Sequence, residues 1–426
     1  MADSPFFWKD RHIKYFLRCL KTFLPHQYTP NDANRMTLAF FVVAGLDLLG
    51  YLHTGLSASE RQGYIDWVYH CQVHSGGFRG FTGTNFGDAK RTSNNECWDP
   101  ANLPATFFAL VTLLILGDDL ARVKREDCLN WLQTMQRADG SFGEVLGPNG
   151  EIAGGRDLRF CCCAAGIRYI LRGRNPNLLA VDDIDSWKLR SFVCASQTYD
   201  GGFAQAPGLE SHAGLTYCGL GALHFLDHPE ENLDNRCYTS SRVIDAGELG
   251  DEKFESLVRW LVFRQTNLLY DDNETDDDDH VDDVKQPVKS FSPDESTDEQ
   301  IHLLPFLPEA SQWPIEQQSC AGFNGRTNKI SDTCYCFWVT GSLALLHRVN
   351  VIDAEACKKY LLEKTQHLVG GFGKGVGELP DVLHSYLGLA SLSLLGEPEI
   401  DRIDPAFCTS KRARQHLESL PWWKGQ

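Results

Sequence analysis

Three side chains have the types and spacing of a metal site. Asp332 and Cys334 stand two residues apart in SDTCYCFW, at the start of a strongly apolar helical run, and His384 stands at the start of another, LHSYLGLASL. Carboxylate, thiolate and imidazole groups bind zinc, and three protein ligands leave a fourth position open for a substrate. A helix cap followed by buried core is the competing interpretation, because Asp favours N-caps and free Cys packs like a small apolar residue.

A second group consists of cationic and hydrogen-bonding side chains that precede or open apolar helical runs. Guanidinium, ammonium, imidazole and phenol groups together suit a phosphate, and an apolar cavity below them would take a hydrophobic tail. A solvated surface charge is the simpler interpretation for any one of them. Their recurrence at equivalent positions favours an anion site. They are Arg159, His212, Arg326, Lys329, Tyr335 and Lys374.

Five copies of a Gln-to-Phe motif divide the chain into repeats. Each copy has Gln, a few variable residues, Gly or Ser, and Phe, and follows an amphipathic helix. The first three begin at Gln72, Gln136 and Gln197, with spacings of 64 and 61 residues. This period is too long for most solenoid units and indicates a pair of helices per repeat. The motifs are QVHSGGF, QRADGSF, QTYDGGF, QSCAGF near Gln317, and QHLVGGF from Gln366.

The fourth repeat is interrupted. The helix VRWLVFRQ ends at Gln265, but its Gly-Phe part follows only after an acidic stretch. Thirteen acidic residues stand against two lysines between Asp271 and Glu299, which accounts for most of the net charge of -17. We expect a disordered acidic insertion at 271–300 within a single domain spanning residues 1–426. The negative charge argues against binding to nucleic acid.

Two kinds of helix alternate along the chain. Runs such as ATFFALVTLLILG and CYCFWVTGSLALL are apolar all round, whereas ERQGYIDWVYHCQ and its equivalents carry charge on one face. The first kind belongs inside a protein and the second outside. Six of each predict an all-α fold, an (α/α)6 barrel (toroid) whose inner ring encloses a cavity. The motif glycines would supply the left-handed C′ position of the preceding helices. The metal-type and cationic residues would meet where inner helices begin.

Cysteine usage and hydropathy indicate a reducing compartment. The chain has 15 Cys, an odd number, mostly embedded in apolar runs such as RFCCCAAG. This is unlike the disulfide framework of a small secreted domain. No signal-peptide pattern and no stretch near ~20 apolar residues is present in the sequence. We therefore expect a cytoplasmic protein that does not span a membrane.

The segment GRTNKISDTCYCFW resembles a signature of the β subunits of protein prenyltransferases, and most of all of the type I geranylgeranyltransferases. The family has a GR-x-NK loop followed by Asp-x-Cys-Tyr and a nearby Trp, and the resemblance extends over nearly the whole chain. It implies that Asp332, Cys334 and His384 bind one zinc ion. The residues implied to bind the isoprenoid diphosphate are His212, Arg326, Lys329 and Tyr335. Those implied to contact the substrates are Arg159, Phe160, Cys162, Cys218, Trp338 and Leu383.

Two positions separate the members of this family. Farnesyl enzymes carry a bulky Trp on the first inner helix, where this chain has Thr37, so the resemblance implies room for a C20 donor. Farnesyl and type II enzymes have an acidic residue ten before the zinc His, associated in farnesyl enzymes with Mg²⁺. This chain has Lys374 there, which would neutralise the diphosphate directly without a Mg²⁺ requirement. Asn102 departs from the His that relatives tend to have at a peptide-contacting position.

The resemblance therefore implies transfer of a geranylgeranyl group from geranylgeranyl diphosphate to a Cys thiol. The acceptor would be a C-terminal CaaX motif with a Leu-like X, on proteins such as small GTPases, and an α subunit would be an obligate partner. Protein farnesyltransferase and Rab-type geranylgeranyltransferase β subunits are alternatives. A terpene cyclase would need an acidic motif on a structured element. A non-enzymatic toroidal binding domain would lack the cations at the rim.

Overall fold

The computed structural model describes residues 6–425 except 23, 25, 29, 93, 175–179, 227–250 and 271–319. The acidic insertion expected at 271–300 thus lies outside the described residues. Within them, the chain is helical apart from three short antiparallel strand pairs. None of the described helices has the length and apolar character needed to cross a bilayer.

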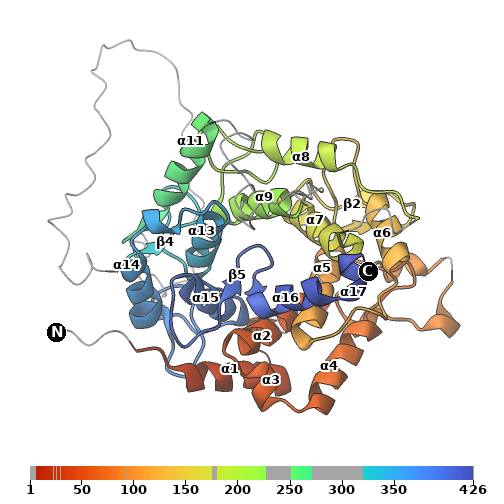
Figure 1. The fold of residues 1–426 in the computed structure, drawn as a ribbon, viewed down its shortest axis with the longest axis horizontal. Helices are drawn as coiled ribbons and strands as arrows, with labels where there is room; N and C mark the ends of the chain where they lie inside the picture. The colour runs from red at the N-terminus through yellow and green to blue at the C-terminus, as the bar shows by residue number, and fades with distance from the viewer. Residues whose placement is uncertain are drawn as a thin grey trace, which may run out of the picture.

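Six apolar helices form the inner ring of a barrel (Figure 1). Each packs against the next along the chain, and the last packs against the first, so the ring is closed. Their side chains are buried on nearly all sides, which is why apolar residues occupy almost every position. The inner helices are α2 (Arg35–Leu48), α5 (Leu103–Leu116), α7 (Leu158–Arg172), α9 (Ala213–Leu226), α13 (Thr333–Leu345) and α15 (Val382–Leu394).

Outer helices alternate with the inner ones and cover them from outside, which confirms the predicted (α/α)6 barrel (Figure 1). The last outer helix continues as a π-helical turn, Tyr360–Thr365, and the short helix α3 (Leu52–Gly55) follows α2. The outer helices are α1 (Lys9–Lys21), α4 (Ala58–His70), α6 (Arg125–Thr134), α8 (Ser186–Ala195), α11 (Asp251–Val262) and α14 (Ala354–Lys359).

The first three Gln-to-Phe motifs and the last form the same turn. Backbone bridges join the Gln to the buried Phe in the first three motifs and the last. In the fourth repeat, β3 (Gln265–Thr266) pairs with β4 (Gly322–Phe323), so that Gln265 faces Phe323. The prediction that this repeat is split between its Gln and its Gly-Phe part is confirmed. The site segment that follows β4 therefore starts from the same Gln-to-Phe pairing as in the other repeats.

The Gln and Gly of these motifs dock each turn onto the next outer helix. The Gln136 amide donates to the backbone oxygen of Asp185 at 2.9 Å and accepts from its N–H at 2.8 Å. Gly140 has φ +91, and a Cβ there would lie 2.2 Å from the backbone oxygen of Lys188 in α8. The predicted C′ position for the glycine is wrong, because α6 ends at Thr134, before the Gln. Close approach of two backbones, rather than helix termination, requires the glycine.

The first outer helix closes the outer ring against the last motif. The backbone N–H of Trp8 donates to Oε1 of Gln366 at 3.0 Å, and Nε2 of His12 lies 2.9 Å from the same oxygen. The backbone N–H of Gly371 donates to Nδ1 of His12, so Nε2 carries the proton. The imidazole stacks on Phe372 with ring centroids 4.8 Å apart. Residues more than 350 positions apart in the sequence thus form one clasp.

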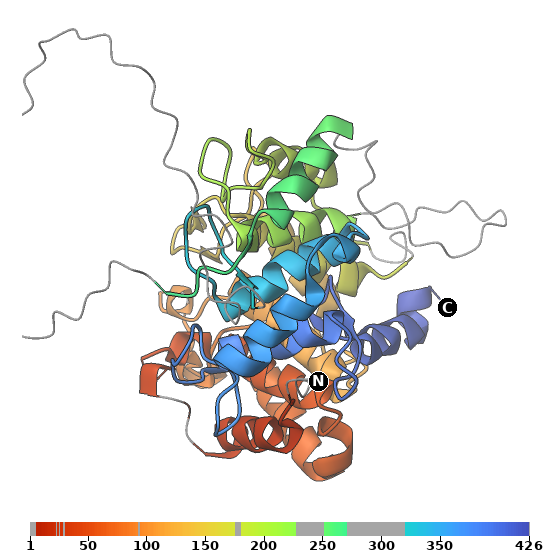
Figure 2. The ribbon, with the colours of Figure 1, turned by 90° about the vertical axis from the view of Figure 1, so that its left-hand side faces the viewer.

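The C-terminal segment covers the end of the barrel at which the inner helices finish (Figures 1 and 2). Arg412 contacts Asp47 near the end of α2, and Nε2 of His416 lies 3.0 Å from the backbone oxygen of Asp118, just after α5. The other end, where inner helices begin, carries the hairpin of β1 (Val145–Leu146) and β2 (Ile152–Ala153). The segment itself comprises β5 (Ile403–Asp404), β6 (Thr409–Ser410), α16 (Lys411–Ser419) and α17 (Pro421–Lys424).

Candidate active site

Asp332 and Cys334 lie at the N-terminus of α13. Asp332 is the N-cap, and its Oδ1 accepts from the backbone N–H of Cys334 at 2.7 Å. Both residues are buried. The cap interpretation of the sequence is therefore right for Asp332, but it does not exclude the metal interpretation, because a carboxylate has a second oxygen.

His384, in the first turn of α15, completes a cluster of three potential ligands. Its Nε2 lies 3.3 Å from Oδ1 of Asp332. The ligand atoms of Asp332, Cys334 and His384 all lie within 4.8 Å of one another. Two adjacent inner helices thus bring the three predicted ligands together.

Asp381 orients the imidazole and was not foreseen from the sequence. Its Oδ2 lies 2.5 Å from Nδ1 of His384, and its Oδ1 accepts from the hydroxyl of Tyr28 at 3.0 Å and caps α15. Nδ1 is thereby engaged, which leaves Nε2 of His384 facing Asp332. The signal was available, because an N-cap Asp three residues before a His can reach its side chain.

The donor set suits zinc. Oxygen, sulfur and nitrogen ligands with an imidazole held by a carboxylate form a typical zinc environment. Burial lowers the pKa of His384, but hydrogen bonds to Asp332 and Asp381 outweigh it and raise the pKa to about 9. Burial and the neighbouring Asp332 raise the pKa of the Cys334 thiol well above its usual range. Protons thus stabilise this carboxylate-rich cluster, and a divalent cation would supply that positive charge instead.

A cavity of about 220 Å³ adjoins the cluster. Four of the residues predicted to bind an anion line it, together with the ligand Asp332. Positive charge and a phenol thus face the same space as the cluster, as an anion site beside a metal requires. The lining residues are Gly325, Arg326, Lys329, Ile330, Asp332, Tyr335 and Lys374.

His212 joins this group through Tyr335. Its Nε2 lies 3.0 Å from the phenol oxygen, and its Nδ1 accepts from the backbone N–H of Gly214 at 3.1 Å. The neutral imidazole therefore donates from Nε2 to Tyr335. Burial, followed by the charge of Arg326, lowers the pKa of His212. Gly325 makes room for the phenol, since a Cβ there would lie 2.2 Å from the Tyr335 ring.

Arg326 and Arg159 differ in their engagement. Nη1 of Arg326 contacts the exposed Glu210 at 3.3 Å, a weak surface pair that an anion can displace. Arg159, at the start of α7, is held by three hydrogen bonds to Asp157, and its side chain is 65% exposed. Arg159 is not among the residues that line the 220 Å³ cavity. Its charge nevertheless helps to lower the pKa of His212, so its place in the anion group stays a prediction.

The residues expected to contact the substrates lie on the inner helices. Most are partly exposed although these helices are otherwise buried, as expected for side chains that face the barrel interior. Trp338 packs against Tyr217 with ring centroids 5.0 Å apart, and the neighbouring thiol of Cys218, together with burial, raises the pKa of Cys162. The partly exposed members are Thr37, Phe160, Cys218, Trp338 and Leu383, whereas Cys162 is buried.

Asn102 caps α5 rather than standing free. Its Oδ1 accepts from the backbone N–H of Ala105 at 2.9 Å, and its Nδ2 donates to Oε1 of Glu144 at 3.0 Å. The amide is thus committed to the protein at the rim. Asn102, which stands where relatives tend to have a His, is thus hydrogen-bonded to the Glu144 carboxylate.

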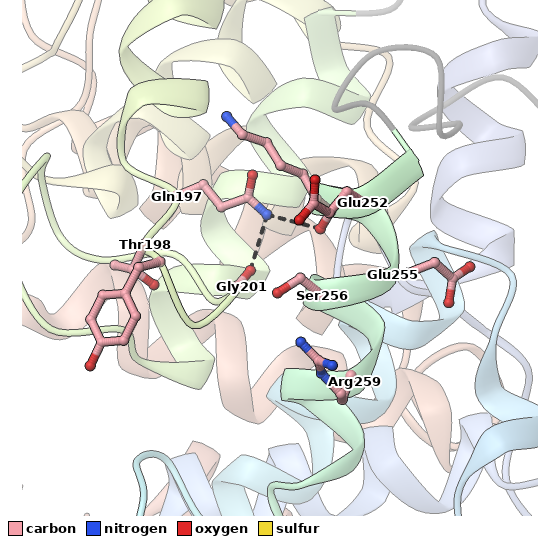
Figure 3. A pocket seen from close by; sticks show the side chains of 9 residues that line it. Gln197, Thr198, Gly201, Glu252, Glu255, Ser256 and Arg259 are labelled. Carbon is pink, nitrogen blue, oxygen red and sulfur yellow. Dashed lines mark hydrogen bonds between the residues drawn. The ribbon is translucent and has the colours of Figure 1, made fainter.

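A larger cavity, about 650 Å³, lies on the outside of the barrel (Figure 3). It is lined by the motif turn at 197–201 and by α11, and the Gln197 amide donates to the backbone oxygens of Gly201 and Lys253 at its edge. It shares no lining residue with the cavity beside Asp332. Size alone therefore does not identify the reactive site.

Comparison with known proteins decides the family. The prenyltransferase alpha-alpha toroid domain matches residues 7–409, almost the whole chain. The chain belongs to the prenyltransferase family. The sequence-based identification and the prediction of a prenyltransferase enzyme are confirmed.

Among its relatives, this prenyltransferase is similar to type I geranylgeranyl β subunits. It is 30% identical to the geranylgeranyl transferase type-1 subunit beta of Arabidopsis thaliana, over 95% of this chain and 89% of the relative. The corresponding subunit of Dictyostelium discoideum is also 30% identical, over 95% and 96%. A solved structure of Candida albicans protein geranylgeranyltransferase-I complexed with GGPP superposes with a TM-score of 0.73 at 27% identity, over 97% of this chain and 99% of that chain.

Proposed function

We propose that this chain is the catalytic β subunit of a type I protein geranylgeranyltransferase. It transfers the geranylgeranyl group of geranylgeranyl diphosphate to the Cys thiol of a C-terminal CaaX motif with a Leu-like X. The observation that carries the proposal is the junction of the Asp332, Cys334 and His384 cluster with a cavity lined by Arg326 and Lys374. A thiol-activating group and a diphosphate-binding group are thereby adjacent.

One zinc ion is the proposed cofactor, held by Asp332, Cys334 and His384. Bound zinc supplies a substrate thiolate at neutral pH, because a dication strongly favours the deprotonated sulfur. Asp381 keeps the ligating nitrogen of His384 directed at the cluster. Mg²⁺ is not required, because the Lys374 ammonium occupies the place of the acidic residue found in farnesyl enzymes.

The cavity residues hold the diphosphate and stabilise the negative charge that grows on it as the C1–O bond breaks. The prenyl group of the donor extends into the barrel interior. There the small side chain of Thr37 leaves space for a fourth isoprene unit. The groups proposed to act on the diphosphate are His212, Arg326, Lys329, Tyr335 and Lys374. Those proposed to contact the prenyl chain and the peptide are Thr37, Arg159, Phe160, Cys162, Cys218, Trp338 and Leu383.

The working enzyme is proposed to be a heterodimer with a prenyltransferase α subunit, acting in the cytoplasm on proteins such as small GTPases. Its β chain is one domain over 1–426 with the acidic segment 271–300 as an insertion. The names of the relatives from Arabidopsis thaliana and Dictyostelium discoideum support the heterodimer, because both denote a beta subunit.

Competing donors and acceptors test this proposal directly. The chain, reconstituted with an α subunit, is given C15 or C20 diphosphate and CaaL or CaaS peptides, with metal analysis of the same preparation. We expect the C20 group on CaaL peptides and one zinc per heterodimer. Preferred C15 transfer to CaaS would instead identify a farnesyl enzyme, and a zinc-free active preparation would refute the assigned ligands.

A further inference from the structure

The loop that carries Arg326 and Lys329 has little structure of its own. Residues 326–329 are exposed, and Asn328 adopts φ +60. Such a segment samples many conformations unless neighbouring groups hold it. If the loop is already fixed before an anion binds, binding does not have to offset the loss of the loop's conformational entropy.

Arg264, which joins α11 to β3, supports the loop from below. It is 5% exposed, and its Nη1 donates to Oγ1 of Thr327 at 3.2 Å. Its guanidinium lies over the Trp260 ring, 4.8 Å from the centroid, and its Nε donates to the Trp260 backbone oxygen at 3.3 Å. Burial lowers the pKa of Arg264. No carboxylate among the described residues forms an ion pair with it, so burying this cation is costly for stability alone.

Asp200 extends the support to His212. Its Oδ2 accepts from Nε1 of Trp260 at 3.0 Å and from the hydroxyl of Ser211 at 2.6 Å. Ser211 directly precedes His212, and Trp260 stacks on Arg264. The motif turn that carries Asp200 also docks onto α11 through Gln197 (Figure 3). One carboxylate thus fixes two segments that bring positive charge or proton donors to the cavity.

Asn324 provides a second tie at the base of the same loop. Its backbone N–H donates to the backbone oxygen of Arg264 at 2.9 Å, and its Nδ2 donates to the backbone oxygen of Lys329 at 2.9 Å. The loop is therefore held at both of its ends. The bond from Arg264 to Thr327 is the tie that reaches its middle.

We infer that Arg264 is a positioning residue: by holding Thr327, it fixes the loop so that Arg326 and Lys329 face the donor diphosphate. What the loop binds rests on the proposed function. Without the bond, donor binding must also order the loop, so the KM for the diphosphate donor rises. The KM for the acceptor peptide and the zinc content stay unchanged, because neither depends on this loop.

Two substitutions at Thr327 form a matched pair. Thr327→Val keeps the shape but removes the accepting oxygen, whereas Thr327→Ser keeps the oxygen. Thr327 is exposed, so neither change threatens folding. In the reconstituted heterodimer we expect Thr327→Val to raise the KM for geranylgeranyl diphosphate and the Kd for inorganic pyrophosphate by about 5- to 20-fold. Thr327→Ser should remain within about twofold of the unmodified enzyme.

A double-variant cycle separates support of the loop from direct contact of Thr327 with the phosphate. If Thr327 acts through Arg264, adding Arg264→Met to Thr327→Val increases the donor KM no further than the larger single effect. If the increases in donor KM caused by the two single substitutions multiply in the double variant, the inference is overturned. An equal rise in the donor KM and the peptide KM would overturn it as well. Should Arg264→Met fail to fold, the Thr327 pair still decides.

Hydrogen exchange of residues 324–330 in the ligand-free heterodimer makes the test independent of the reaction. We expect faster exchange in Thr327→Val than in Thr327→Ser or the unmodified enzyme. Unchanged exchange refutes the positioning role even if the enzyme is active. Faster exchange in a protein that transfers no isoprenoid would refute the proposed function and leave the loop support standing.

Discussion

The cations of the closed end of the barrel and those that line the cavity at its open end differ in their ion pairs. At the closed end, Arg412 pairs with Asp47 and Asp401, and Arg414 pairs with Asp404 and Glu418. At the open end, and within the described part of the chain, neither Lys329 nor Lys374 has an ion-pair partner. The one pair of Arg326 is with an exposed carboxylate.

This difference separates structural charge from functional charge. A neutralised cation contributes to holding two segments together and leaves little field for a ligand. Cations without internal partners around a cavity repel one another unless an anion binds between them. The open end is therefore organised around a ligand, and the closed end around the chain itself. Substitutions at the two ends should divide accordingly into kinetic and stability effects.

Removal of the cluster thiol should have the largest effect. Cys334→Ala deletes one of three ligands, so we expect zinc content to fall to background and transfer activity to be lost. Cys336→Ala is the matched control, because this buried thiol stands two residues further along α13 and outside the cluster. Metal analysis of both purified variants checks the prediction. Full zinc in Cys334→Ala would contradict the ligand assignment.

Reversing the charge of Lys374 should cause the second-largest loss of transfer activity. Lys374→Asp places a carboxylate beside the diphosphate, and we expect a roughly 30- to 1000-fold loss of activity in Mg²⁺-free buffer. Added Mg²⁺ should restore part of it, since the ion can bridge the carboxylate and the diphosphate. Lys374→Ala serves as the control that loses activity without gaining a Mg²⁺ response. Titrations against Mg²⁺ and chelator measure both.

The closed end should respond in stability alone. Asp404→Asn removes the charge that pairs with Arg414, in a carboxylate that is 7% exposed and also accepts the backbone N–H groups of Ala406 and Phe407. We expect a loss of about 2–3 kcal/mol in unfolding free energy, with both KM values unchanged. Asp401→Asn, at a half-exposed pair with Arg412, should cost less than about 1 kcal/mol. A changed KM for the donor in Asp404→Asn would contradict the expectation that the closed end affects stability alone.

The last predicted effect is a pH dependence of the stability of the closed end. Burial lowers the pKa of His224, beside Arg414 and Asp404, to about 4. The unfolded chain takes up a proton near pH 6.5 and the folded chain does not, so stability is lost as pH falls from about 6.5 towards 4. At pH 5 the loss is about 2 kcal/mol.

His224→Asn should flatten that part of the pH profile. His12, whose pKa burial also lowers to about 4, stays in both proteins and serves as the internal reference. Unfolding midpoints between pH 5 and 8 measure the difference. An identical slope in both proteins would show that His224 does not contribute.

Much of the fold was predictable because the chain repeats one local pattern. Five Gln-to-Phe motifs with alternating helices determine the ring, and the split of the fourth repeat at Gln265 followed from spacing alone. The cluster of Asp332, Cys334 and His384 was predictable because equivalent positions of adjacent repeats lie at one end of a barrel. Local periodicity and register are properties that a sequence displays directly.

Contacts made by irregular backbone were not predictable in this way. Asp200 and Arg264 act through turns and loops whose partners, Trp260 and Thr327, lie 60 and 63 residues away in the sequence, and no periodicity reveals them. The glycine was correctly expected at positive φ in the first three motifs and the last, but placed at the wrong site, because helix ends are common and close backbone approach leaves no local signal. Arg159 was grouped with the anion-binding residues from its position in the repeat, but its side chain forms three hydrogen bonds with Asp157, two residues away.

The clasp between His12 and Gln366 determines when this protein can finish folding. During synthesis, helix α1 is made more than 350 residues before its partner turn. Until then, α1 can pack against α2 but lacks its contacts with the last motif, and pairing so distant in the chain is slow. The outer ring therefore cannot close until the segment around Gln366 has been made.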